Sequence, residues 1–376
     1  MSVILQQQIT SDRSVNNAAE PEALGIDHIE LYVGNAFQAA HFYSTTFGLK
    51  PVLYAGPETG AADRASYVVR RGRINLVLTS PIQNGSGIAE ALAEHGEGVR
   101  DVAFAVKDVE EAFNRAIARG AKPVSEPLAI TRGDATCLRA KIATFGNTIH
   151  SLVEQRPTGE ALFPDYEAIE WSAPVAPTTV NTIDHIAVSV GSGQIDRWVS
   201  FYQDVFGFKQ SYEEVTSTDS SGMNSKVVEN KSGSIKVVFV EPVQGRRKSP
   251  IQEFLTFNRG AGVHHLALAC DNIIDNIRTM RSSGVRFMKT PKTYYEMLSP
   301  RVGTVDESLE ALSDSGVLVD RDGGGYLLQI FTLPLQARPT FSIEIIERKA
   351  AKGFGSGNIK ALFEAIEREQ LLRGHA

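Results

Sequence analysis

The sequence has few of the features that mark a disulfide-rich, membrane-spanning or nucleic-acid-binding protein. Its 376 residues include only 2 cysteines, Cys137 and Cys270, which lie far apart and in no metal-type spacing. We therefore expect a reduced, cytoplasmic protein. No signal peptide and no apolar run long enough to span a bilayer is present, so we expect no membrane partner. The net charge of −6 argues against a nucleic-acid partner.

What the sequence does contain is the composition of a globular protein, with 42% hydrophobic and 22% charged residues. Its length suggests two domains or one large pseudo-symmetric body. An internal repeat runs through it. The histidine-containing segment 182–188 and the helical segment 200–208 match 25–31 and 41–49.

A second pair of segments, 98–105 and 262–269, repeats in the same way, and a helical pattern follows each. Each half therefore holds two strand–helix–strand modules, which predicts an α+β fold. Residues 157–181 are proline-rich and aperiodic, as is typical of a linker. We predict a flexible tail at 1–23, an N-terminal domain at 24–156 and a C-terminal domain at 182–376.

The end of the chain predicts a helix. Asn358 is the expected N-cap, and an apolar stripe at helical spacing follows it: Ile359, Leu362, Phe363 and Ile366. Core packing is the simplest interpretation of such a stripe. Because the helix follows the glycine-rich segment 353–357, it could instead act as a lid over a site.

Three strand positions distinguish the two halves chemically. The C-terminal half has His185, His265 and Glu344, where the N-terminal half has His28, Asp101 and Ser151. Two histidines and one carboxylate from different strands form the facial arrangement of non-haem Fe(II) oxygenases, which leaves open positions for a chelating substrate and O2.

A lone strand histidine is more often a hydrogen-bonded core residue than a metal ligand. Glu344 favours the metal interpretation, because a carboxylate within an apolar strand is costly unless it is paired or binds a cation. The N-terminal half lacks a third ligand, so we interpret it as a structural copy in which His28 is a core or pocket residue.

Further blocks surround these positions, at 221–228, 260–265, 322–332, 344–348 and 353–363. Together they resemble the family of 4-hydroxyphenylpyruvate dioxygenase and 4-hydroxymandelate synthase, in the vicinal oxygen chelate superfamily. The resemblance implies two pseudo-symmetric domains of this superfamily, each with two βαβββ modules forming an open barrel. It also implies that the N-terminal domain is structural and the C-terminal domain catalytic, with a terminal lid helix.

The resemblance carries site residues over to this chain. It implies an Fe(II) cofactor held by His185, His265 and Glu344. It implies further catalytic positions at Gln329, Phe354 and Ile359, and substrate-binding positions at Ser221, Asn224, Val240, Pro250, His264 and Phe331. The expected partners are a 2-oxo acid substrate and O2, and a homo-oligomer stays open.

Four positions depart from the homogentisate-forming pattern. Where that pattern has Asn, Gln, Gln and Phe, this chain has, in the same order, Val240, Pro250, His264 and Ile359. The mandelate-forming relatives also have Ile at the last position and an aliphatic residue in place of the Asn. We therefore expect oxidative decarboxylation of 4-hydroxyphenylpyruvate with 4-hydroxymandelate as the product. The alternatives are homogentisate formation, a related enzyme acting on another 2-oxo acid, and a non-catalytic binding protein, which the intact triad disfavours.

Overall fold

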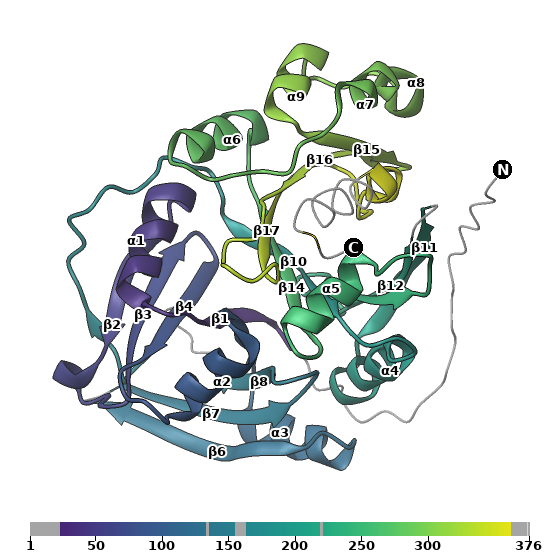
Figure 1. Ribbon diagram of the computed structural model, residues 1–376. Coiled ribbons are helices and arrows are strands. Elements are labelled where there is room, and N and C mark those ends of the chain that lie inside the picture. Colours follow the sequence, from purple (N-terminus) through teal and green to yellow (C-terminus); the bar gives the residue numbers. More distant parts are fainter. Residues whose placement is uncertain (1–22, 133–134, 155–162, 219–220, 362–373, 375–376) are drawn as a thin grey trace.

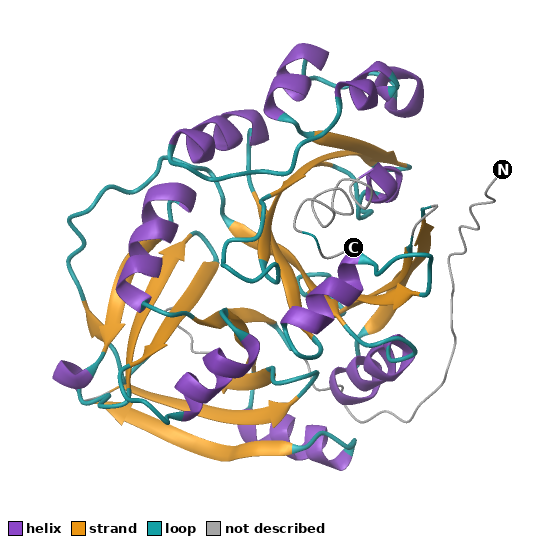
Figure 2. Ribbon diagram, in the orientation of Figure 1, coloured by secondary structure: helices purple, strands orange, loops and turns teal. Residues whose placement is uncertain are grey.

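The protein is described by a computed structural model over residues 23–132, 135–154, 163–218, 221–361 and 374. The predicted tail, up to residue 22, lies outside these residues. Within them, no helix is long and apolar enough to cross a membrane. Two curved sheets with helices packed on them make up the two halves of the molecule (Figures 1 and 2).

The N-terminal half is built on one mixed sheet, whose described strands have the order β6-β7-β8-β5-β1-β4-β3-β2-β9. The strands are β1 (Gly25–Tyr32), β2 (Lys50–Ala55), β3 (Arg64–Arg71), β4 (Ile74–Pro81), β5 (Gly98–Val106), β6 (Pro123–Arg132), β7 (Ala135–Ala143), β8 (Ile149–Glu154) and β9 (Glu167–Ala168). The helices are α1 (Ala36–Phe47), the 3-10 helix η1 (Pro57–Thr59), α2 (Gly87–His95) and α3 (Val109–Ala118).

The C-terminal half repeats this design in a sheet of order β11-β12-β13-β10-β14-β17-β16-β15. The strands are β10 (Thr182–Ser189), β11 (Lys209–Ser217), β12 (Gly222–Glu229), β13 (Lys236–Val243), β14 (Gly262–Ala269), β15 (Leu318–Asp322), β16 (Gly325–Phe331) and β17 (Ser342–Lys349). The helices are α4 (Ile195–Phe206), α5 (Pro250–Phe257), α6 (Ile273–Ser282), α7 (Lys292–Glu296), α8 (Leu298–Val302) and α9 (Leu309–Ser315).

The two sheets have equivalent topologies. In the first sheet the central strand β1 pairs in parallel with β4, the last strand of its own module, and antiparallel with β5, the first strand of the next module. In the second sheet β10 pairs in the same way with β13 and β14. The second modules close with the parallel pairs β5–β8 and β14–β17. The prediction of an α+β fold with two βαβββ modules in each half is confirmed.

The repeated Phe-Gly of the sequence ends the first helix of each half. Helices α1 and α4 stop at Gly48 and Gly207, whose φ values of 73° and 69° lie in the left-handed region that favours glycine. At Gly48 a Cβ atom would also lie 2.4 Å from the carbonyl oxygen of Ala176. The turn therefore returns the chain to the sheet while Phe47 and Phe206 stay in the core.

The segment predicted as a linker is partly built into the N-terminal sheet. Strand β9 pairs with β2, and Phe163 packs with Val68 and Val77 in a small cluster of buried side chains. The Phe163 ring also lies edge-on to the His28 ring, with the ring centroids 5.0 Å apart. The domain boundaries stay a prediction.

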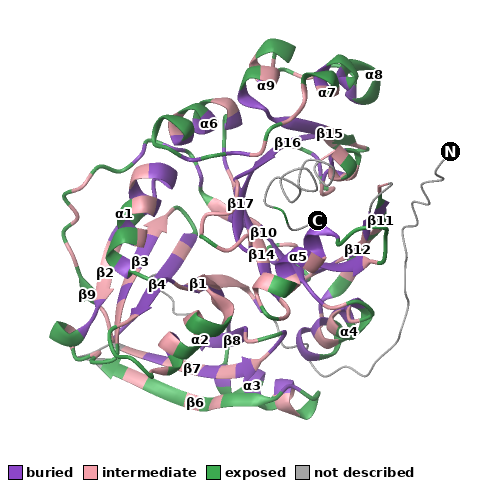
Figure 3. Cartoon of the chain, in the orientation of Figure 1, coloured by how far each residue is buried: buried purple, intermediate pink, exposed green. Residues whose placement is uncertain are grey.

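A continuous apolar core joins the two halves. Figure 3 shows buried positions on strands of both sheets. At its centre, Nε2 of His150 on β8 lies 2.6 Å from the hydroxyl of Tyr202 on α4. Phe104 stacks on His150 and meets Phe206 edge-on, so aromatic rings from both halves interlock there. At the surface, Arg338 donates hydrogen bonds to carbonyl oxygens of both halves, at Glu94 and Phe257.

The predicted start of the C-terminal helix is wrong by three residues, since Gly355 and not Asn358 immediately precedes the first helical residue. The helix begins at Ser356, after Gly355, whose carbonyl oxygen accepts hydrogen bonds from the amides of Asn358 and Ile359. Asn358 lies inside the first turn and is fully buried, because its side chain bonds to α7 and α8 residues instead of capping the helix. The described part of the helix is 356–361. The rest of the apolar stripe and the predicted lid lie beyond the described residues.

Candidate metal centre

The three candidate ligands lie on three neighbouring strands. The residue pairings run from His185 on β10 to Ala267 on β14 and on to Glu344 on β17. His265 is two residues before Ala267, so strand alternation turns its side chain to the same face. One ligand atom from each side chain lies within 4.8 Å of the others, which is a spacing that one metal ion can fill.

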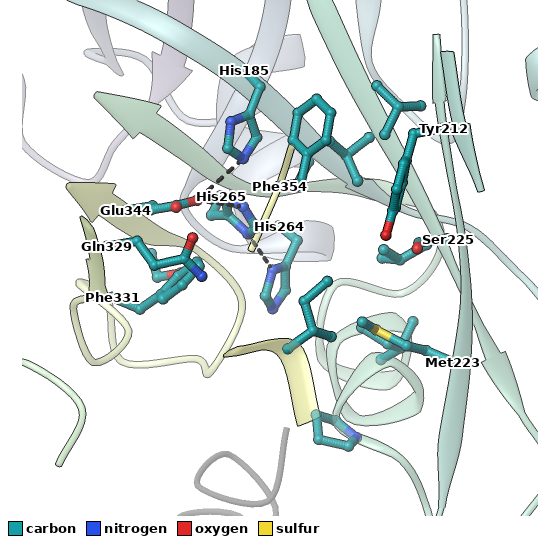
Figure 4. Close-up of a pocket in the computed structure, with 18 of the residues that line it drawn as sticks. His185, Tyr212, Met223, Ser225, His264, His265, Gln329, Phe331, Glu344 and Phe354 are labelled. Atoms are coloured by element: carbon teal, nitrogen blue, oxygen red, sulfur yellow. Dashed lines mark hydrogen bonds and ion pairs between the residues drawn. The ribbon is translucent and has the colours of Figure 1, made fainter. Parts of the chain in front are cut away.

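The three side chains converge on a single point (Figure 4). One carboxylate oxygen of Glu344 lies 3.1 Å from Nε2 of His185 and 3.4 Å from Nε2 of His265. Burial of Glu344 favours the protonated carboxyl, but the charges and hydrogen bonds of the two histidines outweigh it and hold the pKa of Glu344 below its ordinary value. The cluster therefore presents an anionic oxygen and two imidazole nitrogens, a donor set suited to a divalent transition metal.

A second layer of residues orients His185. Asp184 accepts a hydrogen bond from Nδ1 of His185 at 2.8 Å, which directs Nε2 towards Glu344. Arg348 donates two hydrogen bonds to the Asp184 carboxylate, from Nε at 2.6 Å and from Nη2 at 2.7 Å. Burial of His185 lowers its pKa, but Glu344 and Asp184 outweigh burial and raise the value to about 9.

The equivalent positions in the N-terminal half are used differently. The Asp101 carboxylate accepts hydrogen bonds from the amide and the hydroxyl of Ser151, and His28 is held by Asp27 and Phe163. Within the described residues, only the C-terminal triad forms a group that could hold a metal. The interpretation of the N-terminal half as a structural copy stays a prediction.

A pocket opens beside the triad. It is lined by seven of the other predicted site residues: Val240, Pro250, His264, Gln329, Phe331, Phe354 and Ile359. The rings of Phe354 and Phe331 lie edge-on to His185 and His265, with centroid distances of 5.3 and 5.2 Å. The pocket is therefore apolar next to the donor atoms.

The structure departs from the expectation on strand β12. Asn224 on this strand and Ser221 just before it are absent from the described lining, and Met223 and Ser225 occupy this wall. Side chains alternate along a strand, so Asn224 points to the opposite face, where its amide donates to Glu241 at 3.1 Å. The sequence did hold a signal for this difference. Side-chain alternation along 222–229 places Met223 and Ser225 on one face of the strand and Asn224 on the other.

The pocket has further lining residues that the sequence did not indicate: Ala187, Tyr212, Val227, Val238, Ile251, Met288 and Ser342. The Tyr212 hydroxyl contacts Ser356 at the start of the terminal helix and lies 3.0 Å from Glu214. Burial, with the nearby Glu214, raises the pKa of Tyr212 to about 12, so this phenol stays protonated.

Two polar side chains in the pocket wall are available to a ligand. Gln329 is 1% exposed, and its side-chain oxygen has no hydrogen-bond partner within the described part of the chain. His264 lies 2.9 Å from His265 through their Nδ1 atoms. Burial, and secondly the neighbouring His265, lowers the pKa of His264 to about 3, so it presents a neutral imidazole. An unpaired buried amide indicates a site built for a polar partner.

Comparison with known proteins agrees with this geometry. Residues 182–323 and 27–137 each match models of the Glyoxalase/Bleomycin resistance protein/Dioxygenase superfamily. The 4-hydroxyphenylpyruvate dioxygenase of Yarrowia lipolytica is 38% identical, over 93% of each chain. That of Dictyostelium discoideum is also 38% identical, over 93% of this chain and 99% of its own.

The chain belongs to the 4-hydroxyphenylpyruvate dioxygenase family. It is an enzyme of the non-haem iron dioxygenase type. Among solved structures, a triple mutant of 4-hydroxymandelate synthase from Streptomyces coelicolor has 34% identity and a TM-score of 0.83, covering 93% of this chain and 99% of its own. A xylose isomerase-like TIM barrel/4-hydroxyphenylpyruvate dioxygenase fusion protein has 25% identity and a TM-score of 0.71, covering 93% of this chain and 54% of its own. The similar proteins thus include both enzymes of the family that the sequence resembles, 4-hydroxyphenylpyruvate dioxygenase and 4-hydroxymandelate synthase.

Proposed function

We propose that the protein binds one Fe(II) through His185, His265 and Glu344 and converts 4-hydroxyphenylpyruvate and O2 into 4-hydroxymandelate and CO2. The assignment of 4-hydroxymandelate as the product is based on one observation: Ile359 and Val240 line the pocket that holds the triad. For homogentisate formation an aromatic side chain is expected at position 359 and an amide side chain at position 240. Because Ile359 and Val240 stand there instead, this part of the pocket wall is aliphatic.

The donor set fits ferrous iron. A buried carboxylate held anionic beside two imidazoles matches the ligands that Fe(II) oxygenases use, and three protein ligands leave positions free for substrate. Bound iron would supply the redox chemistry that activates O2 while the 2-oxo acid loses CO2. Asp184 and Arg348 would hold His185 with Nε2 facing the metal, as carboxylate partners of metal-bound histidines do.

The other pocket residues would position the substrate and exclude water. Phe331 and Phe354 pack edge-on against the two histidines, which places apolar surface next to the donor atoms. The side-chain oxygen of Gln329 and the neutral imidazole of His264 would be the hydrogen-bonding groups for the polar ends of the substrate. Burial strengthens such bonds, because water does not compete for them.

The two candidate products differ in where the second oxygen atom goes. In both, one atom of O2 enters the carboxylate that forms as CO2 leaves. The second atom enters either the benzylic C–H bond, giving 4-hydroxymandelate, or the ring, giving homogentisate after side-chain migration. A displacement of about 1 Å changes reactivity greatly, so the wall against the ring decides the outcome. Ile359 offers no aromatic face for stacking.

Product identification by mass spectrometry tests this proposal. With 4-hydroxyphenylpyruvate, O2 and Fe(II), 4-hydroxymandelate should exceed homogentisate. Ile359→Phe should move the ratio towards homogentisate, because it restores an aromatic wall. Ile359→Leu is the matched control, since it keeps an aliphatic side chain of similar volume and should preserve the ratio. Homogentisate as the sole product of the unaltered enzyme would overturn the product assignment.

Homogentisate formation is the second candidate, since the curated relatives at 36–39% identity carry the name 4-hydroxyphenylpyruvate dioxygenase. A related enzyme for another 2-oxo acid is the third, because Val240, Pro250 and His264 all line the pocket and all depart from the homogentisate-forming pattern. Oxygen uptake with a panel of aryl and branched aliphatic 2-oxo acids separates it from the other two.

A further inference from the structure

The first turn of the terminal helix is tied to a part of the fold outside the pocket. Asn358 is fully buried, and its side-chain oxygen accepts hydrogen bonds from the Tyr294 hydroxyl at 2.6 Å and from Nη2 of Arg301 at 3.1 Å. Tyr294 lies on α7 and Arg301 on α8. These contacts cross 64 and 57 residues of sequence and hold the helix start against the α7–α8 segment.

Arg301 and Tyr294 are themselves held in place. Arg301 donates to the carbonyl oxygen of Val319 at 2.8 Å and to the Tyr294 hydroxyl at 2.6 Å. The amide of Val319 donates to the same hydroxyl at 2.8 Å. The guanidinium also lies over the Tyr294 ring, 5.1 Å from its centroid. Both side chains are thereby anchored to the edge strand β15.

Asp320 completes the arrangement. Its carboxylate accepts from the amide of Gly357 at 2.9 Å and from Nη1 of Arg301 at 3.3 Å. A Cβ atom at Gly357 would lie 2.4 Å from the Asp320 carboxylate and 2.5 Å from the Arg301 guanidinium. A side chain at position 357 would therefore displace this ion pair from the helix backbone. Hydrogen bonds with a charged partner are about twice as strong as neutral ones.

We propose that these four residues, Tyr294, Arg301, Asp320 and Asn358, form a clamp that sets the position of Ile359 in the pocket wall. Ile359 directly follows Asn358 and lines the pocket, whereas no clamp residue is among its described lining residues. The clamp residues are positioning residues that act through Ile359 on the orientation of the substrate ring. This inference rests on the proposed function, because it assumes that Ile359 faces the substrate.

Two single substitutions test the clamp in the full-length, iron-loaded enzyme. Tyr294→Phe removes one hydroxyl and keeps the ring, and Arg301→Met removes the charge and keeps an extended apolar side chain. Arg278→Met is the matched control, because Arg278 is a 74% exposed arginine of α6 that pairs with Asp275. The readouts are amide hydrogen exchange in a peptide covering 354–361, the product ratio, and the product formed per O2 consumed.

Both clamp variants should exchange the amides of 354–361 roughly tenfold faster, since each loses a buried hydrogen bond. They should also change the product ratio or lower the yield of product per O2. Iron content should match that of the unaltered enzyme, because no metal ligand is touched. The Arg278→Met control should change none of these quantities.

Unchanged exchange in both variants would overturn the proposal. Faster exchange with an unaltered product ratio and an unaltered yield per O2 would also overturn it, since the four residues would then only stabilise the fold. The amount of product formed per O2 consumed can be measured whether the enzyme makes 4-hydroxymandelate or homogentisate. If the unaltered enzyme makes only homogentisate, the product assignment fails, while the clamp is still judged by the exchange rates and by this yield.

Discussion

Asp184 and Asp27 occupy equivalent positions in the two halves, and each holds the histidine that follows it, at 2.8 and 2.6 Å. Asp184 differs in that its histidine belongs to the triad and its carboxylate also accepts two hydrogen bonds from Arg348. Arg348 reaches further, to the carbonyl oxygen of Gly353 at 2.7 Å. A single side chain therefore connects the orientation of a candidate metal ligand to the segment that leads into the terminal helix.

This difference gives a prediction at the residue scale. Asp184→Asn should weaken Fe(II) binding by roughly 10- to 100-fold, because the neutral amide no longer fixes the His185 ring and no longer pairs with Arg348. Titration of the metal-free protein with Fe(II) under anaerobic conditions measures the change. Asp27→Asn is the control, since it makes the same substitution in the half that lacks the triad, and it should leave Fe(II) affinity unaltered. Equal losses in the two variants would contradict a specific role for Asp184.

At the scale of elements, the terminal helix meets the pocket through its first turn. Gly355 precedes that turn with a φ of 79°, and a Cβ atom there would lie 2.5 Å from the side-chain oxygen of Gln329. The helix start and the unpaired amide of strand β16 are therefore in direct contact. Tyr212 on the edge strand β11 touches the same turn through Ser356. Three elements thus meet around one glycine.

Gly355→Ala should therefore affect activity more than stability. The substitution strains the backbone by on the order of 1 kcal/mol and pushes the Gln329 side chain away from its present position. Gly193→Ala is the matched control, because Gly193 has a similar φ of 74° and no atom within 4 Å of its Cβ position. Thermal unfolding should shift by a similar amount in both variants, whereas kcat/KM for 4-hydroxyphenylpyruvate should fall only in Gly355→Ala. A comparable fall in the control would contradict the role of the Gln329 contact.

At the scale of the whole molecule, a buried histidine lies at the junction of the two halves. Nδ1 of His150 donates to the carbonyl oxygen of Val102 at 2.8 Å, and the Tyr202 hydroxyl donates to Nε2 at 2.6 Å. Both ring nitrogens are therefore satisfied in the neutral form. Burial lowers the pKa of His150 to about 4, against the smaller opposing effects of Val102 and Asp101.

A pH dependence of stability follows from this pKa. The unfolded state binds a proton near pH 6.5 and the folded state only near pH 4, so the contribution of His150 is complete above pH 6.5 and is lost as the pH falls towards 4. At 1.36 kcal/mol per pH unit, the loss is on the order of 3 kcal/mol. About 2 kcal/mol of this loss falls between pH 6.5 and pH 5. Denaturant unfolding of the unaltered protein and of His150→Gln, at pH 7.5 and pH 5, measures that part.

The difference in unfolding free energy between His150→Gln and the unaltered protein should shrink as the pH falls, because the glutamine has no proton to gain. His41→Gln on the exposed side of α1 is the control and should track the unaltered protein at both pH values. A difference that is the same at pH 7.5 and pH 5 would mean that His150 does not titrate in this range.

The parts of the protein that sequence alone determined are those encoded within a few neighbouring residues. Repeated strand and helix patterns predicted the four modules, because alternation and helical periodicity record which face of an element is buried. The triad was predicted from the same repeat, since His185 and His265 stand at equivalent places in successive modules and Glu344 lies in an apolar strand. Each of these signals is found by comparing short segments along the sequence, so no knowledge of the packing was needed.

Only the tertiary structure decided which polar groups meet. Strand β12 turns Ser225, and not Asn224, towards the pocket, because pairing with β13 sets which face of β12 is inward. Asn358 looked like a helix cap, yet it bonds to Tyr294 and Arg301 on distant helices. Such contacts depend on how elements far apart in sequence pack against one another, and that packing is a property of the whole chain that no short segment encodes.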